Sequence, residues 1–245
     1  MFVKTQRLKV AVTLLFLLGL PVGLVRAQKD AASPVREAPP ERFDHLVRRD
    51  FFAGYAGDVE ALKRGMVQCE ERLKTDPNNA EALVWHGGGL LFGAGKLFAD
   101  KEWQRGAEQQ QRGLAEMDRA VVLRPKDIGI LVPRAAMLVT YSRFVPNAEQ
   151  RAAMLARVVS DYEEVYLQQK PYIDKLSSHS RNELIFGLAE AYLRTGGDEN
   201  RAKAHALLKL SLTNGDYSKE ADAWLKAPAE AKAATFAHRC IGCHV

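Results

Sequence analysis

Two cysteines and a histidine near the end of the sequence have the types and the spacing for a specific chemistry. Cys240 and Cys243 are separated by Ile241 and Gly242, and His244 follows directly. Two thiols at this spacing on a tight helical turn can add across the two vinyl groups of a haem. The adjacent imidazole then lies beneath the porphyrin as an iron ligand. The sequence therefore predicts one covalent haem c, with thioethers at Cys240 and Cys243 and His244 as the proximal ligand.

Three other interpretations of the motif stay open. A thiol–disulfide site also uses Cys-x-x-Cys, but it normally lies at a helix start beside a strand, and this sequence has no strand pattern. A zinc site would take His238, Cys240, Cys243 and His244. Four ligands would then crowd into seven residues, whereas closed zinc sites usually draw on two separated pairs. A structural disulfide between the two cysteines would leave His244 without a role.

The sixth iron ligand has to come from elsewhere, because only Val245 follows His244. His238 is six residues from His244 and too close to reach the opposite haem face. The remaining candidates are His45, His86, His179, His205 and the methionines, and the sequence singles out none of them. A haem with a free face would hold a large apolar surface in water, so we expect it to dock on the rest of the chain or on a partner.

The first 27 residues have the pattern of a secretory signal peptide. Three basic residues (Lys4, Arg7 and Lys9) precede a short apolar run over residues 10–20, and Ala27 is a suitable residue before a cleavage site at Gln28. The apolar stretch is short for crossing a bilayer. We therefore expect an exported, periplasmic protein, in contact with a membrane only if the signal is not cleaved.

Charge and cysteine content exclude other classes of protein. Lys and Arg total 35 against 30 Asp and Glu, but four of the basic residues lie in the signal, so the remainder is almost neutral. A nearly neutral chain gives no electrostatic reason to expect nucleic acid as a partner. Three cysteines cannot form a disulfide framework. Cys69 lies on the apolar stripe with Leu62, Met66 and Leu73, which predicts a buried thiol.

The body of the chain carries a helical pattern that repeats. Residues 28–41 are rich in Pro and Ala and are expected to form a flexible linker. Residues 42–226 show helical period without strand-like alternation. Within them Gly65-x3-Cys69-x7-Pro77 recurs as Gly113-x3-Met117-x7-Pro125. In each copy the glycine permits close helix packing and the proline stops the helix, which predicts the second helix of a hairpin.

The first helices of the predicted hairpins share another pattern. It is present as Leu83-x2-His86-Gly87-x2-Leu90, as Leu131-x2-Arg134-Ala135-x2-Leu138, and as Ile185-x2-Leu188-Ala189-x2-Tyr192. Three consecutive glycines, 87–89, precede Gly95-Lys96, but the spacing of a phosphate-binding loop fails because Leu90 and Leu97 stand where Gly and Ser or Thr are needed. Close helix packing explains these glycines better.

These hairpin motifs resemble the tetratricopeptide repeat (TPR), most clearly in the segments DPNNAEALVWHG and GLAEAYLRTGGD. The two motif prolines are 48 residues apart instead of the usual 34, which fits an insertion over residues 96–112 that lengthens one hairpin. The resemblance implies stacked antiparallel helix pairs with a concave face that binds peptides or proteins. The expected fold is all-α: a TPR-like helical-hairpin solenoid over residues 42–226, followed by a short helical haem-binding tail over residues 227–245.

The motif of residues 240–244 resembles that of c-type cytochromes. The resemblance implies haem attachment outside the cytoplasm and one-electron transfer by the iron, which agrees with the predicted export. We expect an exported monohaem c-type cytochrome-like protein whose repeats dock a redox or other protein partner. The alternative is a TPR-like protein-binding adaptor in which the motif binds a metal or senses thiol redox state. A haem enzyme with an open iron site, such as a peroxidase, lacks a supporting His/Arg arrangement upstream.

Overall fold

In the computed structural model the described residues are 42–213 and 217–226, and all of their regular elements are helical. They cover the predicted repeat region apart from residues 214–216. The predicted signal peptide (1–27), the linker (28–41) and the haem-binding tail (227–245) lie outside the described residues. No helix of the described part is both apolar enough and long enough to cross a bilayer.

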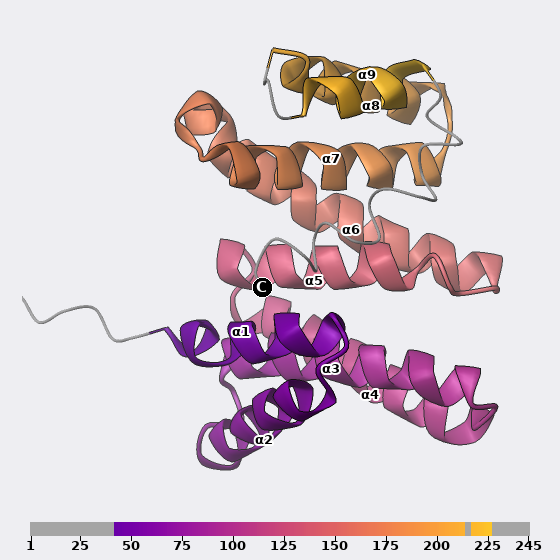
Figure 1. The fold of residues 1–245 in the computed structure, drawn as a ribbon. Helices are drawn as coiled ribbons and strands as arrows, with labels where there is room; N and C mark the ends of the chain where they lie inside the picture. The colour runs from indigo at the N-terminus through magenta and orange to yellow at the C-terminus, as the bar shows by residue number, and fades with distance from the viewer. Residues whose placement is uncertain (1–41, 214–216, 227–245) are drawn as a thin grey trace, which may run out of the picture. The chain divides into compact units, whose positions relative to one another are not determined.

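The described helices pack largely as consecutive pairs (Figure 1). They are α1 (Phe43–Tyr55) with α2 (Val59–Thr75), α3 (Ala80–Ala99) with α4 (Trp103–Leu123), α5 (Ile128–Tyr141) with α6 (Ala148–Gln169), and α7 (Ser178–Thr195) with α8 (Asp198–Ser211), followed by α9 (Ser218–Lys226). A 3-10 helix, Lys170–Lys175, extends α6. The first helices also contact one another in the order α1, α3, α5, α7. The packing confirms an all-α fold compatible with an array of helical hairpins.

Side-chain caps define where most of these helices begin. The side-chain oxygens of five residues accept a backbone N–H from the first turn at 2.8–3.1 Å: Asp58, Asn79, Asp127, Asn147 and Ser177. Such caps satisfy donors that the helix itself leaves free. The predicted helix stops are confirmed as well, because α2 and α4 end two residues before Pro77 and Pro125.

Glycines allow the hairpin helices to come into backbone contact. A Cβ at Gly87 would lie 2.7 Å from the Gly113 carbonyl oxygen, and a Cβ at Gly113 would lie 2.7 Å from the Gly87 carbonyl oxygen. A Cβ at Gly65 would lie 2.9 Å from the Phe51 ring of α1. These contacts confirm the predicted packing role of the glycines. All three residues 87–89 lie inside α3, which agrees with the rejection of a phosphate-binding loop.

The α3–α4 hairpin is the long one that the sequence predicts. α3 has 20 residues and α4 has 21, against 13 and 17 in α1 and α2. The turn between them, residues 100–102, lies within the predicted insertion. Lys101 has a φ of 64°, a left-handed conformation that a non-glycine residue adopts at some cost.

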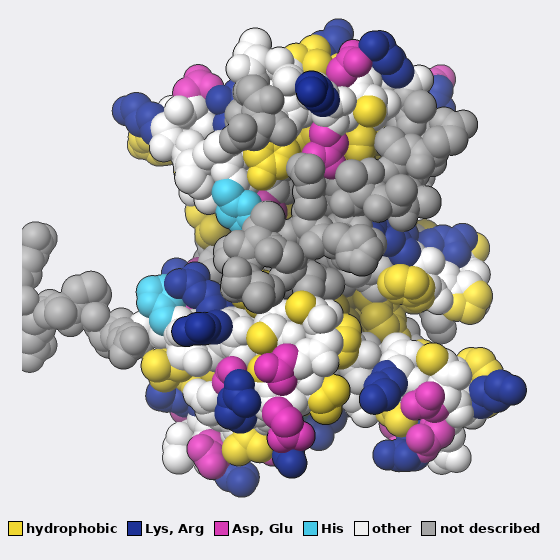
Figure 2. Space-filling view, viewed as in Figure 1, with side chains coloured by type: hydrophobic (Ala, Val, Ile, Leu, Met, Phe, Trp, Pro, Cys, Tyr) yellow, Lys and Arg dark blue, Asp and Glu magenta, His cyan; other side chains and the backbone are white. Residues whose placement is uncertain are grey.

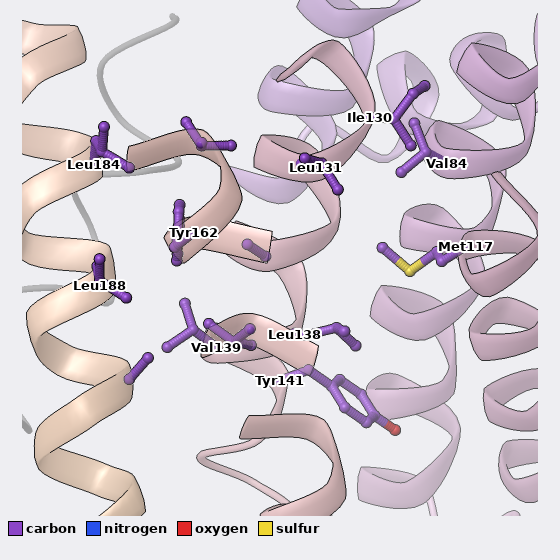
Figure 3. Close-up of a cluster of buried hydrophobic side chains, with 14 of the residues drawn as sticks. Val84, Met117, Ile130, Leu131, Leu138, Val139, Tyr141, Tyr162, Leu184 and Leu188 are labelled. Atoms are coloured by element: carbon purple, nitrogen blue, oxygen red, sulfur yellow. The ribbon is translucent and has the colours of Figure 1, made fainter. Parts of the chain in front are cut away.

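A continuous apolar core runs through the hairpins. Figure 3 shows Val84 and Met117 on one side of α5, and Tyr162, Leu184 and Leu188 on the other. Ile130, Leu131 and Leu138 of α5 are almost completely buried between them. Cys69 is also fully buried and carries a free thiol, as its apolar stripe predicts.

Buried charges connect neighbouring helices across this core. The Arg134 guanidinium of α5 donates to both carboxylate oxygens of Asp161 of α6, at 2.6 and 2.7 Å, and to Asp118 of α4 at 2.8 Å. The Glu190 carboxylate of α7 is fully buried and accepts from Arg143 at 2.7 Å. Buried ions of this kind tolerate little displacement, because a lost partner leaves a charge unpaired away from water.

Candidate functional site

The predicted haem-attachment residues belong to the tail over residues 227–245. Cys240, Cys243 and His244 lie outside the described residues, together with His238. In the part of the chain that is described, no three His, Cys, Asp or Glu side chains gather as a metal site would require. Haem attachment, with its two thioethers and its proximal ligand, therefore stays a prediction. The described residues supply a surface that can be compared with the shape and chemistry of a haem.

One large groove is lined by the first helices of the hairpins, with a volume of about 1040 Å³. Cofactor and small-molecule sites usually span about 300–1,000 Å³, so this groove lies at the top of that range. Each helix contributes residues that recur about once per helical turn, singly or as adjacent pairs. They are residues 45, 48, 52 and 55 of α1, residues 85, 88, 92, 95, 96 and 99 of α3, and residues 129, 132, 133, 136, 137 and 140 of α5. Residues of α6 and α7, including Tyr162 and Leu184, complete it.

Aromatic side chains form much of the groove wall. The Phe52 ring meets the Trp85 ring edge-on, with 5.5 Å between centroids, and Tyr55 and Phe92 lie 5.1 Å apart. Packing fixes these rings, and burial raises the pKa of the Tyr55 hydroxyl. Trp85 is only 6% exposed, and its indole N–H finds no hydrogen-bond acceptor among the described residues. A buried donor without an acceptor is uncommon, and it is a feature that a bound ligand would explain.

Charged side chains of both signs line the groove. Arg42 and Arg48 both contact Asp44, at 3.0 and 3.7 Å, and their side chains are 43% and 45% exposed. Lys96 is exposed, and no ion pair with a described residue involves it. On the face shown in Figure 2, positive and negative side chains of the described residues are mixed. Asp44 and Glu183 also line the groove, so its lining carries three cations against two carboxylates, and Arg42 pairs with Glu81 as well, at 3.4 Å.

Only one of the candidate histidine ligands faces the groove. His45, in the first turn of α1, lines it and is 46% exposed, with Nε2 3.8 Å from the Asp44 carboxylate. His86 does not line the groove; it is fully buried, with Nδ1 2.5 Å from the Glu116 carboxylate. Neither His179 nor His205 lines the groove.

The methionines also divide by position. Met117 and Met154 are buried in the core, as their place in helical stretches predicts. Met66 packs against the core beneath Gly89. Met137 packs against the core as well, but it also lines the groove, where its side chain approaches Gly88 of α3. A Cβ at Gly88 would lie 3.7 Å from Met137 Cε.

The charged end of the groove at α7 contains a carboxyl with an altered acidity. Glu183 lines the groove, and its carboxylate is 3.4 Å from Nε2 of His179. Burial raises the pKa of Glu183, and the neighbouring imidazole partly opposes this. An acidic group at this end contrasts with Arg42 and Arg48 at the α1 end.

The groove has the features that a porphyrin needs. Its apolar and aromatic walls suit the ring, the exposed Lys96 suits a haem carboxylate, and His45 and Met137 offer the two kinds of side chain that complete iron coordination in cytochromes. Comparisons with protein-family models, curated proteins and solved structures gave no match to this chain. The proposal that follows therefore depends on the chemistry of its own residues.

Proposed function

We propose that the protein is an exported monohaem c-type cytochrome-like protein. One haem would be attached through Cys240 and Cys243, with His244 as the proximal iron ligand. The observation that carries the proposal is the motif of residues 240–244, because this spacing of two thiols and an imidazole is specific for covalent haem. The basic and apolar pattern of residues 1–27 supports it, since it predicts export to a compartment where haem is attached.

The haem, when bound, supplies one-electron chemistry at iron, and the chain determines its surroundings. The hairpin packing, the paired glycines and the helix-stopping prolines support a TPR-like solenoid as the scaffold. In this proposal the exposed faces of the helices dock a redox or other protein partner. The mixed charges on the face shown in Figure 2 suit a reversible contact with such a partner.

Haem attachment tests the proposal directly. The full chain is produced with and without a working c-type haem-maturation system, and haem is measured by staining denaturing gels and by the pyridine haemochrome spectrum. The double variant Cys240→Ala/Cys243→Ala should carry no covalent haem. The control Cys69→Ala changes a buried cysteine outside the motif and should keep it. Unstained wild-type protein from maturation-competent cells would refute the proposal.

The groove also favours a second candidate, a protein-binding adaptor. An apolar groove on an array of hairpins suits a peptide or an amphipathic helix. In that case Cys240, Cys243 and His244 would bind a metal or respond to thiol oxidation. Bound zinc, or two reactive thiols in a protein without a Soret band, would support the adaptor and contradict the cytochrome-like function.

A further inference from the structure

We propose that the groove holds the chain's own haem, and that Met137 is the sixth ligand of its iron. The inference rests on the proposed function, which supplies the covalent haem. It commits the groove to one occupant, the haem carried by residues 227–245, and it assigns one ligand among the candidates that the sequence leaves open.

The connecting segment is long enough for this arrangement. Fourteen residues lead from Lys226, at the end of α9, to Cys240. A fully extended segment of this length reaches about 46–50 Å, and one that is half helical still reaches about 34 Å. Contacts run from α9 through α8 and α7 to α5. At about 8–10 Å between packed helices, those three steps cover about 30 Å.

Burial favours a haem in the groove over a haem in water. A porphyrin exposes a large apolar surface, and removing it from water is favourable in proportion to its area. The side chains of Phe52, Trp85 and Phe92 supply aromatic surface to the groove wall.

Charge complementarity sets the orientation of the haem. Its two carboxylates carry negative charge and remain in water beside Lys96, which is exposed near the C-terminal end of α3. Lys96 has no ion pair with a described residue, so it can pair with a carboxylate without breaking another contact. With its carboxylates beside Lys96, the haem places its iron deeper in the groove.

The positions of Met137 and His45 in the groove decide between them as the sixth iron ligand. His45 is half-exposed beside Asp44 in the first turn of α1. This turn lies at the other end of the groove from Lys96, because Arg42 contacts Glu81 of α3, fifteen residues before Lys96. Met137 is half-buried on α5, and its side chain approaches α3, so its thioether lies within the groove wall. Binding of its sulfur to iron breaks no ion pair, whereas His45 lies near the Asp44 carboxylate. Methionine opposite histidine is a known haem ligand set that raises the reduction potential relative to two histidines.

Optical spectra of the matured full chain test the ligand. Met137→Leu keeps the size and the apolar character but removes the sulfur. It should abolish the long-wavelength band of sulfur–iron(III) coordination, lower the midpoint potential, and leave five-coordinate high-spin iron that binds carbon monoxide readily. Met117→Leu, the same change at a core methionine outside the groove, should alter none of these. His45→Ala should leave the sixth ligand in place.

Two results of that experiment would overturn the inference while leaving the proposed function intact. One is a covalent haem whose spectrum is unchanged in Met137→Leu. The other is a bis-histidine spectrum that His45→Ala, but not Met137→Leu, converts to high spin. Absence of covalent haem from the wild-type chain is a different result, because it refutes the proposed function itself.

Filling the groove with a large side chain tests where the haem binds, independently of which residue is its sixth ligand. Gly95 lines the groove, and a Cβ there would meet only Tyr141 Cε2 at 3.8 Å, so a large side chain has open space. Gly95→Trp should displace the haem and speed imidazole binding to the iron by at least tenfold. Ala115→Trp, on the exposed face of α4, should leave the rate unchanged. Equal rates in both variants would show that the haem lies elsewhere, and circular dichroism confirms that both are folded.

Discussion

Alanine substitution at two glycines of α3, Gly87 and Gly95, should change the free energy of unfolding in opposite directions. Gly87→Ala introduces a Cβ 2.7 Å from the Gly113 carbonyl oxygen and 2.7 Å from Met117 Cγ. An ordinary contact needs about 3.4 Å or more, so α3 and α4 have to separate by several tenths of an ångström. Gly95→Ala places its Cβ 3.8 Å from the Tyr141 ring, which is an ordinary contact.

The expected free energies follow from two opposing terms. Alanine stabilises a helix interior by about 0.5–1 kcal/mol relative to glycine. Overpacking a tight interface costs about 1–3 kcal/mol. Gly87→Ala should therefore lower the free energy of unfolding by about 1 kcal/mol, whereas Gly95→Ala should raise it by about 0.5–1 kcal/mol.

Urea unfolding followed by circular dichroism measures both variants against the wild-type chain. The thermal midpoints should move apart as well, because about 1 kcal/mol corresponds to about 2–4 °C in a protein of this size. Stabilisation by both substitutions would refute the reasoning, since it would mean that α3 and α4 do not approach at Gly87 and Gly113.

Three further predictions follow from buried groups. Burial raises the pKa of the Cys69 thiol, so that thiol should stay protonated at neutral pH and should not react with a thiol reagent until the protein unfolds. Arg134→Ala leaves the Asp161 carboxylate buried without its main partner and should cost about 3–5 kcal/mol at neutral pH by urea unfolding. That loss should shrink towards pH 4, because burial already raises the pKa of Asp161 and protonation removes the unpaired charge. Burial raises the pKa of Tyr141 to about 12, above its ordinary value of 10.0, so its phenolate absorbance should develop late in an alkaline titration and stability should fall as the pH rises above 10.

Sequence patterns predicted the elements whose signals are local. Gly65, Cys69 and Pro77 share one helix and its end, so their spacing alone indicates a buried face and a stop. The same reasoning predicted α4 from Gly113, Met117 and Pro125. Proline stops are not universal, however. Pro133 lies inside α5, where it removes one helical hydrogen bond, and the helix continues because buried residues on both sides of it pack against neighbouring helices.

The TPR resemblance implied a concave face, but the side chains that line the groove were not predicted, because they come from several helices. The periodic apolar residues of α3 indicated one buried face, with Leu83, Gly87 and Leu90. A second stripe, Trp85, Gly88 and Phe92, lies on another face of the same helix. A helix that is apolar on two faces predicts contact with something beyond its hairpin partner. The two apolar faces of α3 can be seen in the sequence, but they do not specify which other helices complete the groove.

Intact mass spectrometry of the denatured, mature chain tests the central claim most directly. Protein made beside a working haem-maturation system, and freed of non-covalent haem by denaturation, should weigh one haem more than its polypeptide. It should also show a single titratable thiol, that of Cys69. A mass equal to the polypeptide alone, with three thiols after reduction, would contradict the account.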